Sequence, residues 1–267
     1  MRMLGLPPLK NPLRSRDRHP LEARICAAFQ PIIDIVSGEV FAYEALVRGA
    51  GGQSAGEVLS WIGDDNRREF DQACRVNAIR GAVAAGILST RAKLSINFMP
   101  TAIQSPHEDI QLTLRTAREV GFPSERLMFE FGAADLSSVE HLRGIVRTYK
   151  ELGFTTAIDD FGVGHSGLGL LAEVQTDLIK VDMKIIRGID MSPAKQAIVE
   201  ALVGLARRLR MGLIAEGVET DGELAMLRVL GVRMAQGYLL GRPAIGQLSA
   251  FPPLFNQGIG ERRRKLA

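Results

Sequence analysis

Short apolar segments rich in β-branched and aromatic residues alternate with longer segments of helical period along most of this 267-residue chain. Alternation of this kind favours a single α/β domain with mainly parallel strands, because each helix returns the chain to the start of the next strand. We predict helices at residues 67–85, 110–120, 138–152, 193–209 and 221–230. Strands are predicted at residues 25–35, 40–47, 94–98, 127–131, 155–160, 178–182, 213–215 and 235–239.

The first two predicted strands are separated only by Val36-Ser37-Gly38-Glu39. This turn is too short for a helical crossover, so these two strands are expected to pair antiparallel. Eight strands in one domain of this length favour a closed barrel over an open sheet. We therefore predict a TIM-like (β/α)8 barrel with its first strand antiparallel, covering residues 21–250.

Both ends of the chain differ in composition from this region. Residues 1–20 contain four prolines and five basic residues, and residues 251–267 include Arg262, Arg263, Arg264 and Lys265. We predict a flexible basic leader and a basic C-terminal tail. No aromatic residues are interleaved with these charges as a stacking platform would require, so we do not expect specific nucleic-acid binding.

Other features of the composition indicate the compartment. No apolar run approaches the roughly 18 residues that a membrane span needs, and the N-terminal residues do not resemble a signal peptide. Cys26 and Cys74 are far apart and lack the spacing of a metal site. We therefore expect a cytoplasmic protein without a membrane span, whose two thiols stay reduced.

Polar residues interrupt seven of the predicted strands, close to the same end. Strands of a parallel barrel are buried on both faces and should be almost continuously apolar. Ionisable groups are rarely buried unless they are paired or bind metal, and barrel active sites lie at the C-terminal ends of the strands. Taken together, the interruptions predict a polar site at that rim: Glu44, Asn97, Glu130, Asp159 with Asp160, Lys180 with Asp182, Glu216 and Gln236.

The residue types in this set indicate the chemistry. The set offers five carboxylates as metal ligands, and Asn97 adds an amide oxygen, whereas thiolates and imidazoles are absent: the five are Glu44, Glu130, Asp159, Asp160 and Glu216. Oxygen ligands suit Mg²⁺ or Mn²⁺ rather than Zn²⁺. The adjacent Asp159 and Asp160 could hold two ions, which would clamp a phosphodiester and acidify a water molecule, while Lys180 stabilises the developing charge. The pattern predicts a phosphodiester hydrolase.

The same residues occur in motifs that resemble the EAL domain family of bacterial phosphodiesterases, which open the cyclic dinucleotide c-di-GMP. The likeness extends from about Phe29 to Pro243. Its motifs, in order, are Gln30-Pro31-Ile32, Glu44-Ala45-Leu46 with Arg48, Leu94-Ser95-Ile96-Asn97, Asp159-Asp160-Phe161-Gly162, Asp177 to Asp182, Ala215-Glu216-Gly217-Val218-Glu219-Thr220 and Gln236-Gly237-Tyr238-Leu239.

The resemblance implies a role for each motif position. One metal ion would be held by Glu44, Asn97, Glu130 and Asp159, and the second by Asp159, Asp160 and Glu216. Lys180 and Glu216 would activate the attacking water, supported by Glu219 and Gln236, and the dinucleotide would contact Gln30, Leu46, Arg48 and Pro243. The expected product is linear pGpG, and the family likeness also implies a homodimer formed through the region after the paired aspartates.

The chain departs from the family pattern at two places. The block Glu130-Phe131-Gly132-Ala133 has alanine where the family has a second glutamate, and Val163, His165 and Gly167 replace Thr, Tyr and Ser. These changes favour an alternative, a weak or inactive module that binds c-di-GMP or a protein partner and signals by contact. The GxGxxG pattern at Gly162–Gly167 suggests a dinucleotide cofactor, but that interpretation leaves the other rim carboxylates unexplained.

Overall fold

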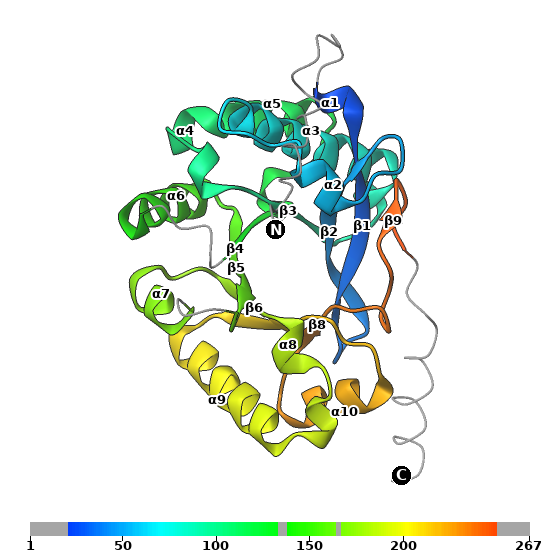
Figure 1. The fold of residues 1–267 in the computed structure, drawn as a ribbon, viewed down its shortest axis with the longest axis vertical. Coiled ribbons are helices and arrows are strands. Elements are labelled where there is room, and N and C mark those ends of the chain that lie inside the picture. The colour runs from blue at the N-terminus through cyan, green and yellow to red at the C-terminus, as the bar shows by residue number, and fades with distance from the viewer. Residues whose placement is uncertain (1–20, 133–137, 164–166, 250–267) are drawn as a thin grey trace, which may run out of the picture.

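In the computed structural model, residues 21–132, 138–163 and 167–249 are described. Eight strands form a closed barrel surrounded by helices, as Figure 1 shows. Neighbouring strands follow the order of the chain from β2 to β8, and β1 closes the barrel between β8 and β2. The strands are β1 (Ile25–Asp34), β2 (Glu39–Gly49), β3 (Lys93–Asn97), β4 (Leu127–Gly132), β5 (Thr155–Phe161), β6 (Leu178–Val181), β7 (Gly212–Ala215) and β8 (Met234–Ala235).

The pairing confirms the predicted fold class. β1 runs antiparallel to both β2 and β8, whereas every pair from β2–β3 to β7–β8 is parallel. The tight turn after β1 is stabilised by the side chain of Asp34, which accepts hydrogen bonds from the backbone N–H groups of Val36 and Ser37. A short strand, β9 (Ala244–Ile245), adds to β1 outside the barrel order.

The long helices begin and end within two residues of their predicted limits. They pack around the outside of the barrel: α3 (Arg67–Ala84), α5 (Gln111–Glu119), α6 (Val139–Glu151), α9 (Pro193–Leu209) and α10 (Asp221–Val229). Shorter helices are α1 (Leu21–Arg24), α2 (Ala55–Leu59), α4 (Pro106–Asp109), α7 (Gly167–Glu173) and α8 (Met183–Ile186). No helix in the described ranges is long and apolar enough to cross a membrane.

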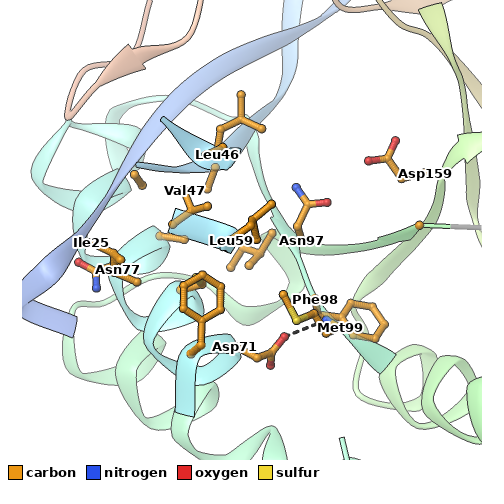
Figure 2. Close-up of a pocket in the computed structure, with 18 of the residues that line it drawn as sticks. Ile25, Leu46, Val47, Leu59, Asp71, Asn77, Asn97, Phe98, Met99 and Asp159 are labelled. Carbon is orange, nitrogen blue, oxygen red and sulfur yellow. Dashed lines mark hydrogen bonds between the residues drawn. The ribbon is translucent and has the colours of Figure 1, made fainter. Parts of the chain in front are cut away.

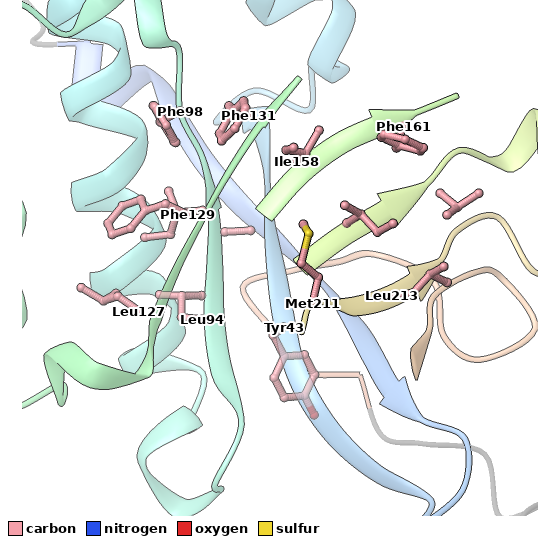
Figure 3. Close-up of a cluster of buried hydrophobic side chains, with 14 of the residues drawn as sticks. Tyr43, Leu94, Phe98, Leu127, Phe129, Phe131, Ile158, Phe161, Met211 and Leu213 are labelled. Atoms are coloured by element: carbon pink, nitrogen blue, oxygen red, sulfur yellow. The ribbon is translucent and has the colours of Figure 1, made fainter. Parts of the chain in front are cut away.

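Besides a group that packs the start of β1 against α1, α2 and α3, two groups of apolar side chains cover the two faces of the barrel wall. The larger group lies between the barrel wall and the helices, where Phe98, Phe129 and Phe131 pack together (Figure 3). The smaller group has one residue from each of six strands: Ile32, Ala42, Met128, Ala157, Leu178 and Ile214. Side chains that alternate along a strand explain both groups, because each strand is buried on its two faces.

The last barrel strand is shorter than predicted. The sequence indicated residues 235–239, but β8 ends at Ala235. After this strand the backbone approaches the segment that follows β7: Val218 N donates to Gln236 O, and Leu239 N donates to Val218 O. A Cβ atom on Gly237 would lie 2.1 Å from the carbonyl oxygen of Val218, so glycine permits this close approach.

Candidate metal centre

The polar residues of the rim lie two positions beyond apolar residues that fill the inside of the barrel. Ala42 precedes Glu44 by two residues, and Met128, Ala157, Leu178 and Ile214 precede the other polar residues by the same step. Residues two apart on a strand point to the same face. The sequence therefore places an apolar plug inside the barrel and, one layer above it, Glu44, Glu130, Asp159, Lys180 and Glu216.

Lys180 lies at the centre of this polar layer. Its ammonium nitrogen is 2.7 Å from carboxylate oxygens of Glu130 and Glu216, 3.2 Å from Asp159 and 3.3 Å from Glu44. The Lys180 side chain is 1% exposed, so these contacts replace its hydration. Four carboxylates from four different strands thus converge on one buried cation.

Amide and hydroxyl donors complete the layer. Asn97 Nδ2 donates to Glu44 Oε1 over 2.9 Å, and Gln236 Nε2 donates to Glu44 Oε2 over 2.8 Å. Ser95 Oγ donates to Glu130 Oε1. The bonds from Asn97 and Ser95 join neighbouring strands, and the bond from Gln236 reaches from the end of β8 to β2 across β1, so the carboxylates are held in place by donors as well as by charge.

Burial and mutual repulsion shift the acidity of several of these groups. Burial, with repulsion from Glu44 and Asp159, raises the pKa of Glu130 to about 8, although Lys180 opposes the shift. The pKa of Glu216 is also raised, chiefly by burial. Burial would lower the pKa of Lys180, but the surrounding carboxylates outweigh it and raise that pKa. The centre therefore holds an excess of acids that favour protons or cations.

Asp159 and Asp160 lie near the end of β5, at an irregular turn of the backbone where the pairing with β6 shifts register. Asp160 has a left-handed backbone with φ of 53°, and its N–H donates to Asp159 Oδ1 over 2.9 Å. Burial and the charge of Asp159 raise the pKa of Asp160. A non-glycine residue with positive φ is strained, and such strain is often kept at functional sites. The turn carries the two adjacent carboxylates to the same opening of the barrel.

Carboxylate oxygens form two groups that could each hold a cation. Glu44, Glu130 and Asp159 make one group, and Asp159, Asp160 and Glu216 make the other, with oxygens in each group within 4.8 Å of one another. Asp159 belongs to both. The donor set is entirely oxygen, which fits Mg²⁺ or Mn²⁺.

A cavity of about 750 Å³ opens beside the candidate centre. Asn97, Asp159 and Asp160 line its polar end, and Leu46, Val47 and Leu59 line its apolar part, as Figure 2 shows for the labelled residues. Cavities of this size, lined mostly by apolar residues with a small number of polar groups, are typical of small-molecule sites.

The predicted substrate-binding residues lie on β1, β2 and the segment before β9. Gln30 is buried in β1 and donates from Nε2 to Gly241 O over 3.0 Å. Arg48, near the end of β2, donates to the neighbouring carbonyl of Val47 over 2.7 Å. Pro243 directly precedes Ala244, which pairs with Phe29 next to Gln30. Leu46 alone of the four lines the cavity.

Glu219 is paired away from the carboxylate cluster. Its side chain contacts the guanidinium of Arg187. The backbone N–H of Glu219 donates to the side chain of Glu223, which also accepts from Thr220 N and Gly188 N. Glu223 therefore fixes the loop that follows Glu216. We did not predict this anchoring role, because in the sequence Glu223 looks only like the glutamate of an ordinary capping box.

Ser95 is a second residue that the sequence analysis did not assign to the site. The signal was present, because Ser95 precedes Asn97 by two residues and lies between the apolar Leu94 and Ile96. Of the departures from the family pattern, Ala133 and His165 lie outside the described residues, as do the leader at 1–20 and the tail at 251–267.

Comparison with known proteins settles the family. The chain matches the EAL domain over residues 15–243. It belongs to the EAL domain family. Among solved structures, the c-di-GMP-bound form of a standalone EAL protein from Vibrio cholerae O395 is 45% identical, with a TM-score of 0.83, over 87% of this chain and 98% of that one. A manganese and c-di-GMP complex of Klebsiella pneumoniae BlrP1 is 29% identical, with a TM-score of 0.79, over 88% of this chain and 58% of that one.

Curated relatives are longer proteins. The cyclic di-GMP phosphodiesterase NbdA of Pseudomonas aeruginosa is 29% identical over 80% of this EAL chain and 28% of its own length. The blue light- and temperature-regulated antirepressor BluF of Escherichia coli is 27% identical over 80% of this chain and 53% of its own. The chain thus spans about half or less of these relatives. Their names include both phosphodiesterases and an antirepressor.

Proposed function

We propose that this EAL protein hydrolyses c-di-GMP to linear pGpG with the help of two divalent cations, Mg²⁺ or Mn²⁺, at the C-terminal rim of its barrel. The observation that carries the proposal is the convergence of two carboxylate groups that share Asp159. Residues 21–250 form the catalytic domain in this proposal.

Charge balance supports two ions rather than one. Glu44, Glu130, Asp159, Asp160 and Glu216 would bring five negative charges when ionised, and Lys180 brings one positive charge. The remaining four negative charges equal the charge of two divalent cations. In the proposed arrangement, Asn97 joins Glu44, Glu130 and Asp159 around one ion, and Asp159, Asp160 and Glu216 hold the other. Two such ions would polarise the phosphodiester and acidify a water molecule.

The chain's own residues supply the remaining functions. Lys180 is held between Glu216 and Glu130, where its ammonium group can hydrogen-bond the attacking water or the phosphate oxygens. Glu216 accepts the proton of that water, and Gln236 keeps Glu44 oriented through its hydrogen bond. Glu219 supports Glu216 indirectly, because both residues lie on the same loop and the contact of Glu219 with Arg187 holds that loop.

The substrate is expected to bind across the rim and the adjoining cavity. Arg48 provides a planar cation for a phosphate or a guanine edge. Leu46 offers an apolar surface to a base, and Gln30 and Pro243 border the site from β1 and the segment before β9. The BlrP1 and Vibrio structures contain c-di-GMP, which supports the same ligand here.

An alternative function is a module with little or no activity that binds c-di-GMP or a protein partner and signals by contact. The relative named an antirepressor favours it, as does Ala133 in place of a second glutamate. The candidate metal ligands are all present, which favours catalysis. A homodimer and a cytoplasmic location remain part of the proposal.

The deciding experiment is chromatography of c-di-GMP incubated with purified protein and Mg²⁺ or Mn²⁺, with EDTA as the control. We expect metal-dependent conversion to pGpG. Intact substrate with both metals would reject the hydrolase. Titration calorimetry with c-di-GMP in Ca²⁺ would then test the binding module, which predicts a saturable heat.

A further inference from the structure

A buried ion pair lies outside the barrel, between α3 and α6. Arg75 is 1% exposed, and its Nη2 is 2.6 Å from Oδ2 of Asp71, one turn earlier in α3. Arg75 Nη1 donates to the hydroxyl of buried Tyr149 in α6 over 3.0 Å. Apolar residues of similar volume often stabilise a core as well as a buried ion pair does. Core stability alone therefore does not explain these charges.

The residues that Asp71 and Arg75 contact lie next to a candidate metal ligand in the sequence. The other carboxylate oxygen of Asp71, Oδ1, accepts a hydrogen bond over 2.9 Å from the backbone nitrogen of Met99 (Figure 2). Met99 lies two residues after Asn97. The Arg75 guanidinium lies 5.7 Å from the ring of Phe98, which follows Asn97. Its Nε has no hydrogen-bond partner within the part of the chain that the structure describes, so ring contacts replace polar ones there.

The same guanidinium reaches the neighbouring strand. It lies 5.6 Å from the ring of Phe129, which precedes Glu130. The Tyr149 ring is 4.9 Å from Phe129 and 5.5 Å from Phe98. Phe98 N donates to Glu130 O over 2.9 Å, which joins the two strand ends. Phe98 and Phe129 face the helices (Figure 3), whereas Asn97 and Glu130 point into the barrel from adjacent positions.

We propose that Asp71, Arg75 and Tyr149 are positioning residues that fix the ends of β3 and β4. They keep Asn97 and Glu130 at the spacing that a divalent cation needs. This inference rests on the proposed function. Asn97 is the exposed last residue of β3, and in the described part of the chain the residues directly after it, Phe98 and Met99, belong to no strand. Its position therefore depends on how Phe98 and Met99 are held. Metal ligands tolerate displacements of only about 0.5 Å before affinity falls.

Two conservative substitutions test the proposal. Tyr149→Phe removes one hydrogen bond and keeps the ring, and Asp71→Asn removes the charge and keeps the shape. The matched control is Ile79→Ala in α3, a truncation of a fully buried residue one turn after Arg75 that makes none of these polar contacts. Thermal unfolding would first establish a temperature at which every variant is folded.

The measurement is titration calorimetry of each variant with Mn²⁺ alone. We expect the dissociation constant for Mn²⁺ to rise about tenfold in both conservative variants. This is the low end of the loss in metal affinity that follows when a residue orienting the metal ligands is changed. The control should lose at least as much thermal stability and keep the wild-type constant. Equal dissociation constants in all four proteins would overturn the positioning role and leave the proposed hydrolase intact. Wild-type protein that binds Mn²⁺ but leaves c-di-GMP intact would reject only the hydrolase, whereas wild-type protein without a Mn²⁺ signal would reject both.

Discussion

The ammonium nitrogen of Lys180 lies 2.7 Å from a carboxylate oxygen of Glu130, and both side chains are buried inside the barrel. Burial raises the pKa of Glu130 to about 8, against an ordinary value of 4.5, even with Lys180 beside it. The folded, metal-free protein therefore binds a proton at Glu130 that the unfolded chain has already released near neutral pH.

This relationship predicts a pH dependence of stability without metal. A group whose folded pKa is raised stabilises the folded state fully below its unfolded pKa, and that contribution is lost as the pH rises through the folded pKa. We expect the Tm in EDTA to fall between about pH 5 and pH 9 for this reason. Glu130→Gln, which mimics the protonated acid, should flatten the profile. A wild-type Tm that rises over this range, or an unchanged slope in the variant, would contradict the assignment.

Asp159 should be the most sensitive ligand, because it belongs to both carboxylate groups. We expect Asp159→Asn and Glu44→Ala to lower phosphodiesterase activity by about three orders of magnitude, as several kcal/mol of transition-state stabilisation are lost, while the fold is retained. The control is Asp177→Asn. The carboxylate of Asp177 accepts a hydrogen bond from Thr156 N at the N-terminal end of the barrel strands, which is the end opposite the carboxylate groups. Initial rates with Mn²⁺ measure the effect, and full activity in Asp159→Asn would exclude the two-metal mechanism.

Ser95 offers a test of how the buried carboxylates are oriented. Its hydroxyl is a hydrogen-bond donor to Glu130 inside the barrel. Hydrogen bonds to charged groups contribute about 1.5–3 kcal/mol. We expect Ser95→Ala to weaken Mn²⁺ binding by about tenfold or more, measured by calorimetry. Ser89→Ala is the matched substitution: this exposed serine lies in the turn before β3 and donates to Gly86 O, and the variant should bind Mn²⁺ as the wild type does.

Gly237 should tolerate no side chain. A Cβ atom there would lie 2.1 Å from the carbonyl oxygen and 2.2 Å from the nitrogen of Val218, and the backbone cannot move aside as a flexible side chain can. We expect Gly237→Ala to lower the free energy of unfolding by about 3 kcal/mol or more. Gly204→Ala in α9, where a Cβ meets no atom within 4 Å, should instead raise it by about 0.5–1 kcal/mol. Urea titration of both variants distinguishes the close approach from a general effect of alanine.

The barrel and its rim could be predicted from the sequence because local rules and parallel topology suffice for them. A residue such as Glu44 or Lys180 interrupts an apolar strand, and parallel strands bring their C-terminal ends to one edge. The antiparallel first strand followed from the short turn predicted at residues 36–39. β8 was predicted too long because the local sequence of residues 235–239 does not show that the backbone of Val218 replaces a strand partner there.

The sequence alone determined which residues reach the rim, since a two-residue period along each strand decides the face of every side chain. Only the tertiary structure decided which of them touch. The distances from Lys180 to four carboxylates depend on how the strands stagger and close. The pairing of Arg75 with Tyr149 depends on how two helices pack, because these residues are 74 positions apart in sequence. Such contacts, and the shifts in pKa that burial produces, depend on long-range packing and desolvation rather than on local sequence pattern.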